Sequence, residues 1–228
     1  MTGMTLLGGL PYDTSLVSLL TLIAYILLLL VGDCASGLLA ARLLLRPQSF
    51  VLIRAGWRKW FSRALRRCCL SALFACGILL IPALLRRPEG QTLLAWLLFT
   101  LHMEAVAAVQ VLLMALFENA MAALTPIIFV QLASLLLSRK LPGSAALLLP
   151  GNWGSLFRTK EYEYSQLYRI LSDISAPEEA AAGSFPEYVA SRLHRGFPLW
   201  AAIALNLAVL LPICLFGWRL VRRKHQTK

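Results

Sequence analysis

The sequence predicts an all-α integral membrane protein, a polytopic bundle of about five transmembrane helices. Of its 228 residues, 59% are hydrophobic and only 14% are charged, whereas soluble domains average about 25% charged residues. Five apolar runs have the length that a membrane-spanning helix needs, about 20 residues. Many of the cations behind the formal charge of +11 flank these runs, as basic cytoplasmic loops do in membrane proteins.

The five runs follow one another with polar interruptions. The first is extended backwards toward Tyr12 to reach spanning length and is predicted to end at Gly32-Asp33. The runs cover residues 16–31, 68–85, 92–117, 120–137 and 198–218. Breaker-rich residues 86–90 and the pair Glu118-Asn119 predict turns. An alternative treats 92–137 as one kinked helix followed by a re-entrant piece.

Charge orients these spans across the membrane. Residues 33–67 hold eight Lys/Arg and the tail from Arg219 holds five, so both are expected in the cytoplasm. Five spans place both basic segments in the cytoplasm if the N-terminus is outside and the C-terminus is inside. Two basic pairs, Arg86-Arg87 and Arg139-Lys140, then lie outside. Their side chains can reach the lipid headgroups, and the outer polar stretch is long enough to weaken the rule.

Three regions are predicted. Residues 1–137 form four transmembrane helices with a cytoplasmic basic coupling loop at 33–67. Residues 138–198 form an extracytoplasmic interfacial and helical region, in which 142–157 is too short to span and 159–195 is amphipathic. Residues 199–228 form the last transmembrane helix and a basic cytoplasmic tail.

Several functional classes have no support in the sequence. A nucleic-acid binder would carry its cations on a mostly polar soluble domain. No CxxC pair and no Cys/His set with zinc spacing occurs, so no metal site or cofactor is predicted. There is no Walker A pattern, no GxSxG elbow and no HExxH helix. The N-terminus lacks the basic region of a signal peptide, and no lipidation motif is evident.

Polar residues inside the predicted spans are candidate functional positions. Ionisable groups there are costly and usually face the bundle interior or water. They either line a transport pathway or form hydrogen bonds between helices, for instance from His102 or Glu104 to Gln131. His102 and Glu104 are two residues apart and so do not share one helix face. The candidates are His102, Glu104, Gln110 and Gln131. An intramembrane enzyme that uses His102 and Glu104 is a third functional class.

The stretch from Ser49 to Arg67 is basic, rich in tryptophan and helical in its apolar spacing. Three interpretations are open. It is a juxtamembrane charge cluster on anionic lipid, an amphipathic helix in the membrane interface, or a docking helix for a cytoplasmic partner.

Two segments resemble the permease subunits of type-2 ATP-binding-cassette (ABC) exporters, especially small bacterial permeases of the lantibiotic-immunity and bacitracin type. FVLIRAGWRKWFSRALRR, residues 50–67, looks like a family segment with the pattern F-x-L-I-R-x-x-S-R-x-x-W. LLLPGNWGSLFRT, residues 147–159, looks like its L-P-G-N-x-G-x-x-x-R segment. Trp57 stands where the family pattern often has Ser. The family usually has one more span before the first run seen here.

The resemblance implies a fold, a partner and a role for the basic stretch. In such permeases a coupling helix between the second and third spans docks on a separate cytoplasmic ATPase, and two permease subunits pair in the bilayer. Here residues 50–62 would be that helix, with docking residues Arg54, Trp57, Arg58, Lys59 and Trp60. It also implies a multi-pass protein of the bacterial cell membrane that exports an apolar or peptide-like substrate and confers antibiotic resistance.

A second functional class stays open at this stage. A non-transporting polytopic accessory or immunity protein would need the basic stretch only to hold lipid. A neighbouring gene for an ABC ATPase would favour the exporter. The sequence leaves the substrate open, and homodimers and heterodimers are both compatible with it.

Overall fold

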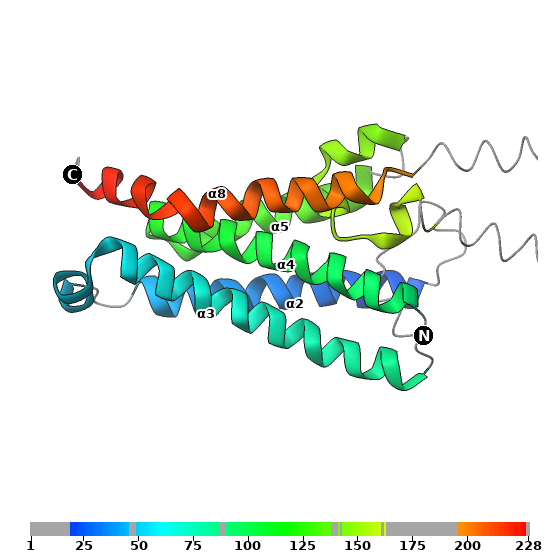
Figure 1. Cartoon of the computed structure of the whole chain (residues 1–228), viewed down its shortest axis with the longest axis horizontal. Coiled ribbons are helices and arrows are strands. Elements are labelled where there is room, and N and C mark those ends of the chain that lie inside the picture. Colours follow the sequence, from blue (N-terminus) through cyan, green and yellow to red (C-terminus); the bar gives the residue numbers. More distant parts are fainter. Residues whose placement is uncertain are drawn as a thin grey trace, which may run out of the picture.

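The structure is a computed structural model that describes residues 19–45, 49–86, 90–137, 141, 143–160, 162 and 196–226. Its five long helices are α2 (Leu19–Leu44), α3 (Ser49–Arg86), α4 (Gly90–Phe117), α5 (Ala120–Leu137) and α8 (Leu199–Gln226) (Figure 1). Each is long and apolar enough to cross a membrane. The described part of the chain contains no strand, only the isolated bridge between Thr159 and Phe197. The predicted all-α polytopic bundle is confirmed.

Helix α4 is the centre of the bundle. It packs against α2, α3, α5 and α8, and 67% of its most apolar stretch is buried, against 22–33% in the other four helices. Its buried side includes the small residues Ala105, Ala107, Ala108 and Ala115. Small side chains let neighbouring helices approach closely, which is how membrane helices gain packing energy.

Helix α2 continues through Gly32-Asp33, where the sequence analysis placed the end of the first span. The prediction of a loop over residues 33–67 is therefore wrong: α2 runs to Leu44, and α3 begins at Ser49. The reason is that Asp33 faces the protein interior, with 1% of its surface exposed. A polar residue on the buried side of a helix does not mark the end of a membrane span.

The basic stretch is divided by a kink at Gly56, whose φ of 71° and ψ of 161° interrupt the helix. Only glycine adopts this conformation at low cost. Residues 49–55 form a short helix that lies across the end of the bundle, and Figure 1 shows it nearly end-on beside the start of the long part of α3. After the kink, Trp60, Phe61 and Ala64 are buried in the bundle, so this apolar side of the stretch packs on the protein's own core.

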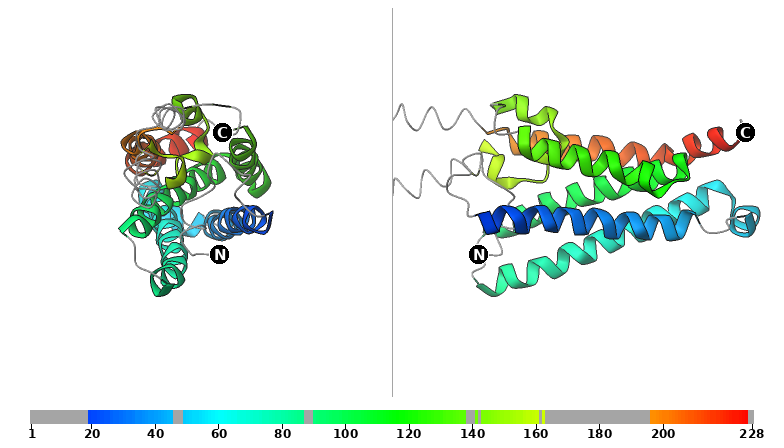
Figure 2. Two further views of the ribbon diagram at one scale, coloured as in Figure 1. Left: turned by 90° about the vertical axis from the view of Figure 1, so that its right-hand side faces the viewer. Right: turned by 180° about the vertical axis from the view of Figure 1, so that it is seen from behind.

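The connections gather at two opposite ends of the bundle (Figures 1 and 2). The start of α2, the start of α8 and the 3-10 helices η2 (Gly143–Leu148), η3 (Pro150–Asn152) and η4 (Leu156–Arg158) lie at one end. The end of α2, the kink, the turn from α4 to α5 and the C-terminal end of α8 lie at the other. This is the arrangement that five alternating spans require. Most of the predicted external helical region, 159–195, lies outside the described residues.

Replacing Gly56 with alanine tests whether the kink depends on glycine. A Cβ at Gly56 would meet no atom within 4 Å, and the same holds at Gly77 in the regular part of α3. The two sites thus differ in backbone conformation and not in available space. We expect Gly56→Ala to lower the free energy of unfolding in mixed micelles by about 1–3 kcal/mol. Gly77→Ala should raise it by up to about 1 kcal/mol. Equal effects of the two substitutions would contradict the conclusion that the kink at position 56 depends on glycine.

Candidate functional site

The predicted docking residues do not form one surface. Arg58 and Lys59 are exposed, Trp57 is half-buried and Trp60 is buried, with 5% of its surface exposed. Arg54 lies in the short helix before the kink, and its side chain is outside the described residues. The side chains of Arg58 and Lys59 are therefore available to a partner, whereas Trp60 belongs to the core of the bundle.

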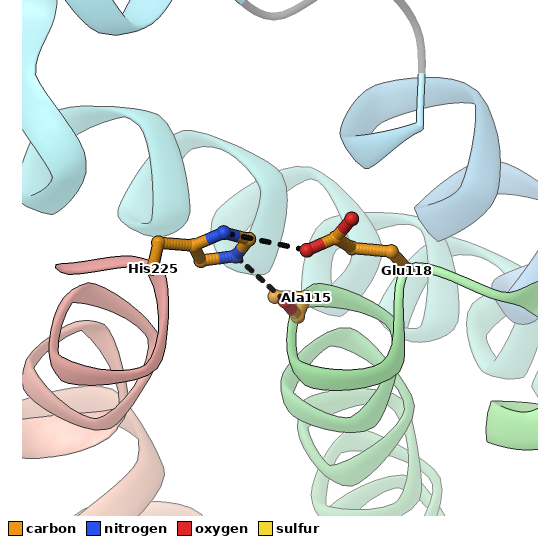
Figure 3. A network of polar contacts seen from close by, with 3 residues as sticks. All are labelled: Ala115, Glu118 and His225. Carbon is orange, nitrogen blue, oxygen red and sulfur yellow. Dashed lines mark hydrogen bonds and ion pairs between the residues drawn. The ribbon is translucent and has the colours of Figure 1, made fainter. Parts of the chain in front are cut away.

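Trp57 joins the kink of α3 to the end of α8. Its ring stacks on His225 at a centroid distance of 4.8 Å, with an angle of 24° between the ring planes. Figure 3 shows the other contacts of His225: its Nδ1 lies 3.3 Å from a carboxylate oxygen of Glu118, and its Nε2 lies 3.3 Å from the carbonyl oxygen of Ala115. Three elements thus meet at one histidine, which fixes the C-terminal end of α8 against the kink.

The turn from α4 to α5 is built by the Glu118-Asn119 pair that the sequence analysis singled out. Glu118 has a φ of 55°, the left-handed conformation that ends a helix. The Oδ1 of Asn119 accepts hydrogen bonds from the backbone N–H of Met121 and Ala122 at 2.9 and 3.3 Å, which caps α5. The turn therefore holds Glu118 at the end of the bundle where His225 arrives.

Exposed cations are concentrated toward this end. They come from the end of α2, the first half of α3 after the kink and the end of α8. They are Arg42, Arg58, Lys59, Arg63, Arg66, Arg67, Arg219, Arg222 and Arg223. By the positive-inside rule this end is expected to face the cytoplasm.

A second polar site lies between α4, α5 and α8. His102 of α4 is buried and contacts two amides: its Nδ1 lies 3.1 Å from Oδ1 of Asn206, and its Nε2 lies 3.0 Å from Nε2 of Gln131. The amide nitrogen of Asn206 donates to the carbonyl oxygens of Trp153 and Ala202 at 3.1 and 3.0 Å. Asn206 Oδ1 must therefore accept, so the proton of neutral His102 sits on Nδ1, and Nε2 accepts from Gln131. The contact from His102 to Gln131 that the sequence analysis considered is present.

The segment with the sequence Pro-Gly-Asn-Trp-Gly, residues 150–154, covers this site. The backbone N–H of Gly151 donates to Oγ of Ser134 at 3.1 Å. A Cβ at Gly151 would lie 2.8 Å from Oε1 of Gln131, and one at Gly154 would lie 2.8–2.9 Å from the ring and Cβ of His102. Both glycines therefore permit a close approach of backbone to side chain, which explains two positions of the motif.

The fold of this covering segment depends on two buried polar residues, the Asn and Arg of the L-P-G-N-x-G-x-x-x-R pattern, for which the sequence predicted no individual role. Arg158 has only 1% of its surface exposed and donates a hydrogen bond to Oδ1 of Asn152. The amide nitrogen of Asn152 donates to the carbonyl oxygen of Ala146 at 2.9 Å. An arginine just after an apolar segment normally indicates an exposed cation, and only the three-dimensional fold shows that Arg158 faces inward.

A groove runs between α5 and α8, with α4 as its floor. It has a volume of about 290 Å³ and is lined mainly by apolar side chains such as Val109, Ile127 and Val209. His102, Gln131 and Asn206 supply its polar lining. The groove can therefore take an apolar molecule, while the polar atoms of these three side chains are bonded to one another, to backbone carbonyl oxygens or buried.

The other two candidate pathway residues lie elsewhere. Gln110 is fully buried and bonds to α2: its Nε2 donates to the carbonyl oxygen of Asp33 at 3.0 Å, and its Oε1 accepts from Ser36. Glu104 is only half-buried and joins neither site. Within the described residues, no group of His, Cys, Asp and Glu could hold a metal ion.

Replacing Gly154 with alanine tests the contact between the covering segment and His102. The added methyl group would overlap the imidazole, so we expect a loss of about 1–3 kcal/mol in the free energy of unfolding. His102→Gly removes both the obstructing ring and the Cβ of His102, which would lie 2.9 Å from the added methyl group. In that background Gly154→Ala should cost much less, and unfolding titrations of the four chains in mixed micelles measure the difference. Equal costs in both backgrounds would contradict the contact.

Comparisons with protein families, with curated proteins and with solved structures found no match to this chain. The resemblance to ABC exporter permeases therefore stays a prediction from the two sequence segments.

Proposed function

We propose that this chain is the transmembrane permease subunit of an ATP-driven ABC exporter that moves an apolar or peptide-like molecule outward. In this proposal a separate cytoplasmic ATPase binds the short helix before Gly56 and the cations that follow it. A second permease subunit pairs with the chain in the bilayer. The proposed location is a bacterial cell membrane.

The observation that carries the proposal is the orientation of residues 49–55. They lie across the end of the bundle that also bears the exposed cations. A helix in that position meets the aqueous phase at the membrane surface, where a soluble partner can bind it. Trp57, directly after the kink, stacks on His225 and ties the start of the long part of α3 to α8, so a force passed from the short helix through the kink would reach the transmembrane bundle.

The groove between α5 and α8 supports a transport role. Its apolar lining suits a molecule that partitions into lipid, and the network of His102, Gln131 and Asn206 closes it where the covering segment meets the helices. Gln110 and Glu104 are not among its lining residues. We therefore assign His102 and Gln131 to the proposed pathway and Gln110 to the contact between α2 and α4.

Charge removal at the basic end tests the docking role. The chain would be coexpressed with an ATP-binding subunit encoded beside its own gene, purified through a tag on the chain, and assayed for ATP hydrolysis in liposomes. Arg58→Ala with Lys59→Ala should reduce copurification of the ATPase and ATP turnover by at least about tenfold, a loss of about 1.4 kcal/mol. The matched control is Arg66→Ala with Arg67→Ala, two equally exposed cations farther along α3.

The pattern of outcomes separates docking from stability. Trp57→Ala removes a ring contact within the chain, so it should lower both thermal stability and copurification. The Arg58 and Lys59 substitutions should leave stability unchanged because both side chains are exposed. Full copurification and ATP turnover after the double substitution would refute the docking role. They would favour a non-transporting accessory protein with a lipid-binding basic end.

A further inference from the structure

Asp33 occupies an unusual position for a carboxyl group. It lies at the middle of the span Ile23–Leu44, with 1% of its surface exposed. Neither of its carboxylate oxygens has a hydrogen-bond partner. Ionisable residues inside membrane spans are rare and normally pair with another polar group. The lack of a partner at Asp33 therefore needs an explanation.

The side chains of Ser36 and Gln110 bond to each other and to the backbone of Asp33, and not to its carboxyl group. Gln110 Nε2 donates to the carbonyl oxygen of Asp33 at 3.0 Å, and Ser36 Oγ lies 3.1 Å from the same oxygen. Ser36 Oγ also bonds to Gln110 Oε1. These contacts hold α2 against α4, but they leave the side chain of Asp33 without a donor.

Within the part of the chain that the structure describes, the ionisable groups around Asp33 supply no nearby countercharge. On α4, His102 is bonded to α5 and α8, and Glu104 is half-exposed. The described helix α5 contains no ionisable residue. On α3, Cys76 lines a neighbouring cavity, and the cations lie toward the basic end. On α2 itself Tyr25 interacts electrostatically with Asp33 and with Arg158 of η4.

An unpaired carboxylate in this environment would cost several kcal/mol, and a proton removes that cost. A metal ion is a poorer solution because it needs several oxygen or nitrogen ligands, and the described residues offer no such cluster. We propose that Asp33 is a proton-binding site at the centre of the membrane, neutral in the arrangement described here and able to release its proton when the bundle rearranges. This proposal does not depend on an ATPase partner.

Space for water lies beside this site on one side of α2, although Asp33 itself is not among the residues that line it. A cavity of about 270 Å³ between α2, α3 and α4 is lined by Gly32 and Ser36, which flank Asp33, and by Cys76. Water needs about 10–15 Å³ of such volume per molecule, so the cavity has room for several waters. The hydroxyl of Ser36 gives them a polar contact beside Asp33.

Dicyclohexylcarbodiimide, an apolar reagent that modifies protonated carboxyl groups, tests the site in the full chain. Vesicles containing the chain would be treated from acidic to alkaline pH, and the modified residue identified by mass spectrometry. We expect modification of Asp33 that declines as pH rises. Asp33→Asn, which keeps the shape of the side chain, should abolish it. The matched control Glu104→Gln removes the half-buried Glu104, the other acidic residue within a described span, and should leave the modification of Asp33 unchanged.

Infrared difference spectra between acidic and alkaline pH provide a measurement that needs no reagent access. A protonated-carboxyl stretching band should be present in the unaltered chain and in Glu104→Gln, and absent from Asp33→Asn. The proposal is overturned if the band survives Asp33→Asn or if the unaltered chain has no band that changes with pH. The proposal is also overturned if the reagent modifies only other carboxyl groups and the infrared band is unchanged in Asp33→Asn. Neither measurement involves ATP hydrolysis, so the proposed transport function can fail without affecting this result.

Discussion

The requirement that polar groups inside a bilayer find partners within the protein governs this structure. Helix α4 meets it most fully because it contacts all four other long helices. Its His102 is bonded to α5 and α8, its Gln110 to α2, and the carbonyl oxygen of Ala115 to His225. Small buried residues such as Ala107 and Ala108 bring the neighbouring helices close enough for these bonds.

Much of the architecture could be predicted from the sequence because apolar runs of spanning length fold as helices in lipid. The turn at Glu118-Asn119 was also predictable, since both residue types favour helix ends. The first span was misjudged because Gly32-Asp33 reads as a helix end in one dimension. In three dimensions Gly32 makes room for Met103 of α4 and Asp33 points into the bundle.

The candidate sites were only partly predictable, for a related reason. His102 and Gln131 stand out as polar residues in apolar runs, but Asn206 completes their network from a position 104 residues beyond His102 in the chain. The kink at Gly56 gave no signal beyond a single glycine, and it separates the short helix of residues 49–55 from the rest of the basic stretch. Trp60 looked like a docking residue because an amphipathic pattern does not say whether lipid, a partner or the chain itself covers the apolar side.

Helix α8 connects the two polar sites along the bundle. It carries Asn206, which bonds to His102 and to the covering segment, and His225, which stacks on Trp57. These residues are about 28 Å apart at 1.5 Å per residue. Pro212 lies between them and removes one backbone hydrogen bond, so the helix bends most easily there. Because a rigid rod transmits displacement and a bend absorbs it, the stiffness of α8 at Pro212 decides how strongly the basic end and the groove are linked.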